Sequence, residues 1–129
     1  MNEKELFHMR KIIKLTLIKI GIRCDLIGFV YLCYAVELVI LDPELSFHLC
    51  KELYVKIGEK FNVAKTSSIE RSIRHAIDIA QVEKNFLILN EMFGSLLYSI
   101  NDKPTSGELI RLVAEYYRLG LYKEQLKIN

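Results

Sequence analysis

Apolar residues recur along this chain at spacings of three and four, the period of helices that bury one face against a core. The first such run spans residues 3–20 and is followed by Gly21, a residue type that commonly ends helices in the left-handed conformation. Neither an internal repeat nor an alternating strand pattern is present. The pattern predicts an all-α fold of about six helices, forming one domain over residues 1–129. The apolar positions of the first run are Leu6, Met9, Ile12, Ile13, Leu17 and Ile20.

A second predicted helix is apolar on nearly every side, which places it at the centre of the fold. Asp25 is positioned to cap this helix, and Leu41 is its last apolar residue. Its uncharged run covers 11 residues, or 16 residues when the run is extended across Glu37. Because a membrane span needs about 20 apolar residues, we expect a buried helix and no membrane partner.

Cap and turn residues divide the rest of the chain. Ser67 and Glu70 have the spacing of a capping box, in which two side chains satisfy free backbone N–H groups at a helix start. Thr105 and Glu108 repeat this spacing. The remaining predicted elements are a helical stretch from Asp42 and Pro43 toward Phe61 that can break near residues 53–54, a turn at 62–66, a helix from Ser67 to about Val82, a helix from Asn85 through Tyr98, a loop at 101–104 and a last helix that ends near 119–120.

The composition excludes a disordered chain, because 51% of the residues are hydrophobic. The formal net charge of +2 is the sum of three regions that differ in charge. Residues 1–23 carry +4, residues 24–64 carry −3 and residues 65–129 carry +1. This polarity can orient a domain on a polyanion such as a nucleic acid. Solvated helix faces explain the same polarity, so charge alone does not decide the function.

Three cysteines, Cys24, Cys33 and Cys50, form no CxxC pair, and no secretory signal precedes them. We expect reduced thiols that serve as small apolar side chains on the helices of a cytoplasmic protein. The histidines lie too far apart in sequence to suggest a zinc site. The sequence therefore predicts neither a metal nor a cofactor.

Residues 53–80 predict a helix, a tight turn and a second helix with two distinct faces. One face of the second helix carries only small aliphatic side chains, which suits close packing. Gly58 is expected where the two helices cross, and Asn62 is expected to take the left-handed conformation in the turn. The opposite face carries Ser67, Ser68, Glu70, Arg71, Arg74, His75 and Asp78.

A helix-turn-helix protein presents such a face to the major groove of DNA. Arginine can donate two hydrogen bonds to the O6 and N7 atoms of guanine, and a carboxylate can accept one from cytosine N4. An ordinary hairpin of amphipathic helices has the same pattern. The pattern by itself therefore leaves both interpretations open.

A longer stretch of the chain resembles one family. Residues 67–77 read Ser-Ser-Ile-Glu-Arg-Ser-Ile-Arg-His-Ala-Ile, which is similar to the recognition helix in the C-terminal effector domain of stage 0 sporulation protein A, a sporulation response regulator. A block of this length is far more specific than a helix-turn-helix pattern alone. The resemblance runs from about Leu15 to Leu119 and includes Lys60-Phe61-Asn62, Phe93-Gly94, Lys103-Pro104-Thr105 and Glu108.

The resemblance implies a transcription regulator that binds double-stranded DNA, with residues 67–82 in the major groove. It also implies two head-to-tail domains, as a homodimer, on tandem operator copies. RNA polymerase sigma factor would contact residues 83–91, which begin with Glu83 and end with Glu91. By position, the resemblance assigns base contacts to Glu70, Arg71 and Arg74, phosphate contacts to His75 and Lys65, and places in the same interface to Ser67 and Ser68.

The chain departs from the family at three points. Ser68 replaces an arginine, and a lost bidentate base contact is worth roughly 1–3 kcal/mol of discrimination. Gln81 replaces a tryptophan, which changes the packing near the end of the recognition helix. The family's receiver domain has no space in 129 residues, so we expect a natural short homologue without phosphorylation control; an excised fragment is the alternative.

Two other classes of function compete with DNA binding. A protein-interaction module that has lost DNA reading could antagonise the full-length regulator or sigma factor, and Ser68 and the weak net charge favour it. An enzyme is the third class, but the sequence has no phosphate loop, nucleophile elbow or HExxH motif. Asp42 and Glu44 are typical helix-start residues. We therefore expect a DNA-binding regulator and not an enzyme.

Overall fold

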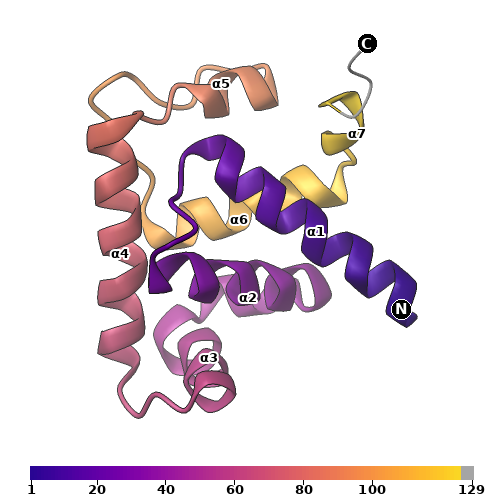
Figure 1. Cartoon of the computed structure of the whole chain (residues 1–129), viewed down its shortest axis with the longest axis vertical. Helices are drawn as coiled ribbons and strands as arrows, with labels where there is room; N and C mark the ends of the chain where they lie inside the picture. The colour runs from indigo at the N-terminus through magenta and orange to yellow at the C-terminus, as the bar shows by residue number, and fades with distance from the viewer. Residues whose placement is uncertain (126–129) are drawn as a thin grey trace.

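The computed structural model describes residues 1–125 and has an all-α fold, as the sequence pattern predicts. The described residues contain no strand, and their seven α-helices include one very short helix at the end (Figure 1). The elements are α1 (Glu3–Ile20), α2 (Ile27–Leu41), the 3₁₀ helix η1 (Pro43–Phe47), the π-helical segment η2 (Leu49–Leu53), α3 (Tyr54–Phe61), α4 (Thr66–Glu83), α5 (Ile88–Phe93), α6 (Ser106–Arg118) and α7 (Tyr122–Gln125).

α2 lies at the centre of the fold, as its apolar composition predicts. It packs against α4 and α6 most extensively and also against α1 (Figure 1). Eight of its 15 residues are buried, including the charged residue Glu37. Arg10 of α1 donates two hydrogen bonds to this carboxylate, over 2.7 Å to Oε1 and 3.1 Å to Oε2, which compensates the buried charge. No helix among residues 1–125 has the length and apolar character needed to span a membrane.

α2 and α4 cross where their backbones touch. A Cβ atom at Gly28 would lie 2.3 Å from the carbonyl oxygen of Ser72 and 2.9 Å from Cβ of Ala76, so a side chain there would push the helices apart. Gly58 lies where α3 approaches both the turn and α4, as expected. A Cβ atom at Gly58 would lie 2.6 Å from the carbonyl oxygen of Val63 and 3.5 Å from Cδ1 of Ile69. The crossing that positions α4 therefore depends on Gly28.

Several predicted helix ends are confirmed. Gly21 has a φ of 112° and its N–H donates to carbonyl oxygens of the last turn of α1. Asn62 has a φ of 58° and ends α3 in the left-handed conformation. The capping box of α6 is present, because Thr105 Oγ1 accepts from the N–H of Glu108 and the Glu108 carboxylate accepts from the N–H of Thr105. These signals act over three or four residues of chain.

The predicted caps of α4 and α2 are wrong. α4 begins at Thr66, so Ser67 lies within the first turn, and no side chain caps the helix. Glu70 does not reach back to the helix start, because its carboxylate accepts a hydrogen bond from Ser106 of α6. α2 begins at Ile27 without a side-chain cap, because the Asp25 carboxylate is held by the guanidinium of Arg23.

The segment between α2 and α3 is more divided than predicted. Pro43 opens a helix as expected, but the helix is the short 3₁₀ element η1 and the Asp42 side chain forms no cap. The chain breaks at His48, whose ψ of 56° is not helical, and continues as η2 before α3 begins at Tyr54. The break expected near residues 53–54 is therefore a change of helix type, and the interruption lies five residues earlier.

The helix predicted from Asn85 through Tyr98 is also wrong. α5 ends at Phe93, because Gly94 takes the left-handed conformation with a φ of 63°. Asn90 fixes the chain that follows: its Oδ1 accepts from the N–H groups of Leu97 and Tyr98, and its Nδ2 donates to the carbonyl oxygen of Tyr98. One side chain thus satisfies three backbone groups of the loop, including two N–H groups that a longer helix would have paired internally.

The cysteines fit their expected role only in part. All three thiols are free, but Cys24 and Cys50 are exposed. Cys24 precedes α2 in the connection from α1, so it fills no helical packing position. Only Cys33, half-buried on α2, is the small helical side chain that the sequence predicts.

We predict that Gly28→Ala lowers the free energy of unfolding by about 1–3 kcal/mol, because the added methyl group meets helix backbone. Gly107→Ala in α6 is the matched control. Its Cβ would lie 2.9 Å from the end of the Leu49 side chain, which can rotate away, and alanine has about 1 kcal/mol better helix propensity than glycine. Urea denaturation compares the two variants, and equal unfolding free energies would contradict a tight contact at Gly28.

Candidate nucleic-acid interface

α3 and α4 form the two helices of a helix-turn-helix, and residues 62–65 form the turn. The left-handed conformation of Asn62 turns the chain, and the N–H of Val63 donates to the carbonyl oxygen of Gly58 over 2.9 Å. Leu53 and Ile57 are fully buried and Phe61 is half-buried, so this edge of the first helix faces inward as predicted. The turn is short and hydrogen-bonded, which fixes the direction in which α4 leaves it.

The apolar face of α4 is buried along most of its length. The Ser72 hydroxyl donates to the carbonyl oxygen of Ser68, so it adds no unpaired polar group where α4 meets Gly28 of α2. The opposite face of α4 is consequently the one that solvent and other molecules can reach. The buried side chains are the five predicted ones, Ile69, Ile73, Ala76, Ile77 and Ala80.

The predicted interface residues do lie on this accessible side of the molecule, but with different exposure. Ser68 and Glu70 are half-buried at the two edges of the face. Arg71 and His75 border a shallow hollow at the start of α2, whereas Glu70 and Arg74 border a groove at the start of α6. The exposed members of the set are Lys65, Ser67, Arg71, Arg74 and His75.

Glu70 is tied to the rest of the fold. Its Oε1 atom accepts a hydrogen bond from the Ser106 hydroxyl over 3.2 Å and lies 3.6 Å from Nε of Arg74. The Tyr54 hydroxyl is buried nearby, and within the described part of the chain it has no hydrogen-bond partner. Burial is the main cause that raises the pKa of Tyr54 well above its usual value, and the neighbouring Glu70 carboxylate raises it further. Glu70 thus connects α4 with the start of α6 and holds the Arg74 guanidinium along the helix.

The far half of α4 is fixed by polar contacts as well. Lys103, in the loop before α6, forms an ion pair with Asp78. The Gln81 side chain donates from Nε2 to the carbonyl oxygen of Ile100 over 3.0 Å. Gln81 therefore bonds α4 to the loop between α5 and α6, whereas a tryptophan at this position would offer only an apolar surface and one N–H donor.

The N-terminal end of α4 is the most positive part of the interface. The first turn of this 18-residue helix contains no acidic side chain, and its free N–H groups have no side-chain cap. Such an end carries a partial positive charge that favours phosphate. Among residues 1–125, no acidic side chain pairs with Lys65 or Arg71. Both cations are therefore available to an anionic partner.

The contacts of two residues that shape this face could not be predicted from the sequence. Ser106 and Lys103 reach α4 from the start of α6, where they engage Glu70 and Asp78. Ser106 lies 36 residues from Glu70, and no local pattern links such a pair. The Thr105 capping box signals where α6 begins, but it does not signal which part of the chain lies against it.

The buried back of α4, the left-handed turn and the exposed cationic face define the class of protein: a helix-turn-helix domain. The family model of the sporulation initiation factor Spo0A C-terminal domain matches residues 13–117, most of the chain. The chain therefore belongs to this family, as the resemblance of residues 67–77 predicts. The family comprises DNA-binding effector domains of sporulation regulators rather than enzymes, which supports a general role in DNA binding.

We predict that Glu70→Ala lowers the free energy of unfolding by about 1–2 kcal/mol, because it removes a charged hydrogen-bond acceptor from Ser106 beside a buried tyrosine. Arg71→Ala, one residue along the same helix, is the control and should change the unfolding free energy by less than about 0.5 kcal/mol. Urea denaturation measures both values. A Glu70→Ala variant as stable as Arg71→Ala would contradict the anchoring of α4 through Glu70.

Proposed function

We propose that this protein is a sequence-specific DNA-binding transcription regulator in which α4 enters the major groove. The observation that carries the proposal is the exposed cationic face of α4, in particular Arg71, on a helix whose opposite face is locked against α2. A recognition helix needs both properties, because base readout depends on side chains held in a fixed register.

Each interface residue has a proposed role. Arg71 and Arg74 are the base-reading side chains, suited to guanine. Lys65 lies at the positive end of α4 and, with His75, contacts phosphates; Ser67 and Ser68 line the same surface. Glu70 remains a candidate acceptor for a cytosine amino group, because both of its described contacts use Oε1 and leave Oε2 to a base.

The other end of α4 supports a proposal about protein partners. α4 is about 27 Å long at 1.5 Å per residue, and α3 and α5 lie at its opposite ends (Figure 1). Near the α5 end, Val82 is 87% exposed, Leu96 94% and Ile100 60%. A hydrogen bond from Gln81 to Ile100 holds the loop after α5 at this end of α4, and exposed apolar side chains that gather in one patch are typical of protein contacts. We propose that residues 83–91 and this neighbourhood contact RNA polymerase sigma factor, and that two copies bind tandem DNA sites as a homodimer.

Selection from random duplex oligonucleotides at physiological salt tests the proposal directly. We expect the purified chain to enrich one short motif that contains guanine, because two arginines face the groove. The control is the Arg71→Ala/Arg74→Ala double variant, which should enrich no motif or a much weaker one. Failure of the unmodified chain to enrich any motif would contradict sequence-specific binding and favour the interaction module suggested by the exposed apolar side chains near α5.

Single substitutions separate base reading from phosphate binding. We expect Arg71→Ala to weaken binding to the selected motif roughly 10- to 100-fold, with little effect on unrelated DNA. Lys65→Ala should weaken binding to both DNAs and reduce the slope of log K against log salt by about 1. Fluorescence anisotropy at several salt concentrations measures these effects, with Lys123→Ala in α7 as the control. An unchanged affinity for the motif in Arg71→Ala would contradict base reading by this residue.

A further inference from the structure

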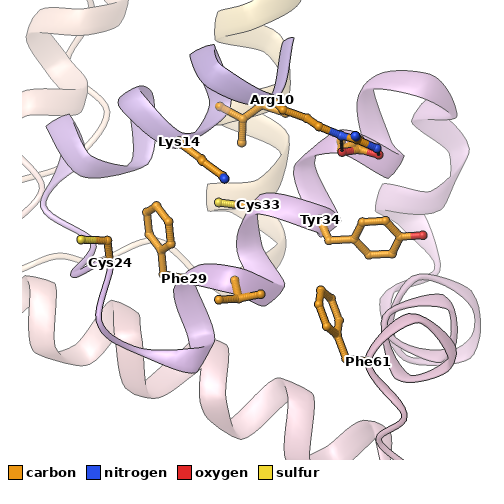
Figure 2. A pocket seen from close by; sticks show the side chains of 10 residues that line it. Arg10, Lys14, Cys24, Phe29, Cys33, Tyr34 and Phe61 are labelled. Carbon is orange, nitrogen blue, oxygen red and sulfur yellow. Dashed lines mark hydrogen bonds and ion pairs between the residues drawn. The ribbon is translucent and has the colours of Figure 1, made fainter. Parts of the chain in front are cut away.

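A pocket of about 280 Å³ lies between α1, α2 and the last residue of α3, and no residue of α4 lines it (Figure 2). Its walls are mainly apolar. Ile13 and Phe29 are almost fully buried beneath it, Val30 is 37% exposed at its rim, and Phe61 closes the side toward the turn. Pockets that bind small molecules have this composition, with an apolar lining and a few polar groups.

The pocket carries one positive charge without a counter-charge. Arg10 and Glu37 form a bidentate ion pair in its wall and so compensate each other. Burial raises the pKa of the Cys33 thiol to about 12, so this thiol is uncharged at neutral pH. Lys14 pairs with no acidic side chain in the described part of the chain. Figure 2 shows the Lys14 side chain extending toward Cys33, which places its ammonium group at the pocket.

We propose that this pocket binds a small monocarboxylate with an apolar body. The carboxylate pairs with Lys14, and the body occupies the space bounded by Ile13, Phe29 and Val30. A water-sized group fills about 30 Å³, so the pocket accommodates roughly ten non-hydrogen atoms. A saturated or aromatic acid of that size satisfies both the single cation and the apolar walls. The carboxylate would exchange water for a charged partner at the exposed Lys14 ammonium, and a second anionic group would find no further free cation in the pocket lining.

The pocket is connected to the helix-turn-helix through Phe61. The Phe61 ring packs against Tyr31 with a centroid distance of 5.5 Å and against Tyr34 with 5.8 Å. Phe61 is also the residue directly before the left-handed Asn62. A ligand that contacts the Phe61 ring therefore changes the surroundings of the turn. This connection supplies a local readout of binding that does not depend on DNA.

Titration of the full chain with octanoate, followed by amide NMR, tests the inference. We expect saturable shifts at Lys14, Val30 and Asn62. Lys14→Gln should weaken the affinity about fivefold, the loss expected for a partly exposed ion pair. Lys11→Gln, another exposed lysine of α1 that does not line the pocket, is the matched control and should bind octanoate normally.

Two further measurements make the result decisive. Lys14→Arg should keep the affinity, whereas Val30→Trp should abolish it by filling the pocket; Val55→Trp, at a comparably exposed position outside the pocket, should not. Octanol should bind more weakly than octanoate to the unmodified chain. Equal binding by Lys14→Gln and Lys11→Gln, or shifts confined to the exposed Leu96 and Ile100, would overturn the proposal. Amide spectra of each variant without ligand establish that it is folded.

Discussion

The close approach of α2 and α4 at Gly28 is the constraint on which the interface depends. The backbone of α4 touches α2 at Ser72, between the turn that precedes α4 and the middle of the helix. This contact sets the rotation of α4 about its own axis, because only one face of the helix carries side chains small enough to follow α2. The rotation in turn decides that Arg71 points outward. The position of the proposed base-reading side chain is therefore fixed by a residue that lacks a side chain.

Other contacts along α4 reinforce this placement. Glu70 joins the first half of the helix to the start of α6, and Glu83 at the other end lies 3.5 Å from the Arg23 guanidinium in the connection between α1 and α2. Each contact joins α4 to a different segment, so the helix is held at both ends and in the middle. The surface pair at Glu83 adds little free energy on its own. The ion pair instead helps to hold α4 in a fixed position, and a helix that reads DNA must keep a fixed position in the groove.

The parts of the fold that sequence reasoning predicts are those that depend on short stretches of chain. Helical period predicts the buried face of α4, and Gly21, Asn62 and Thr105 mark helix ends through contacts within a few residues. The failures share a physical cause. Asp25 and Glu70 have the right spacing for caps, but each carboxylate binds a cation or hydroxyl that competes with the helix start.

In the candidate site, too, some features follow from a short stretch of chain and others depend on distant segments. Helical geometry suffices to predict which residues share the outer face of α4, because the face follows from a rotation of 100° per residue. It does not predict that Glu70 is half-buried, because its hydrogen-bond partner Ser106 belongs to α6, 36 residues further along the chain. Helical geometry also fails to predict that α5 ends early, at Phe93. The three hydrogen bonds of Asn90 to the following loop depend on the path of that loop, which no periodic pattern describes.

The outward side chains of α4 contribute little to the core, and this separation has an evolutionary consequence. Ser68 takes part in the described hydrogen bonding through its backbone N–H and carbonyl groups and not through its side chain, and Ser67 and Arg71 are exposed. Substitutions at these three positions change the outer surface of α4 and leave the α2 contact intact. In evolution the outer face of α4 can therefore vary without disturbing the packing of Gly28 against the aliphatic face behind it.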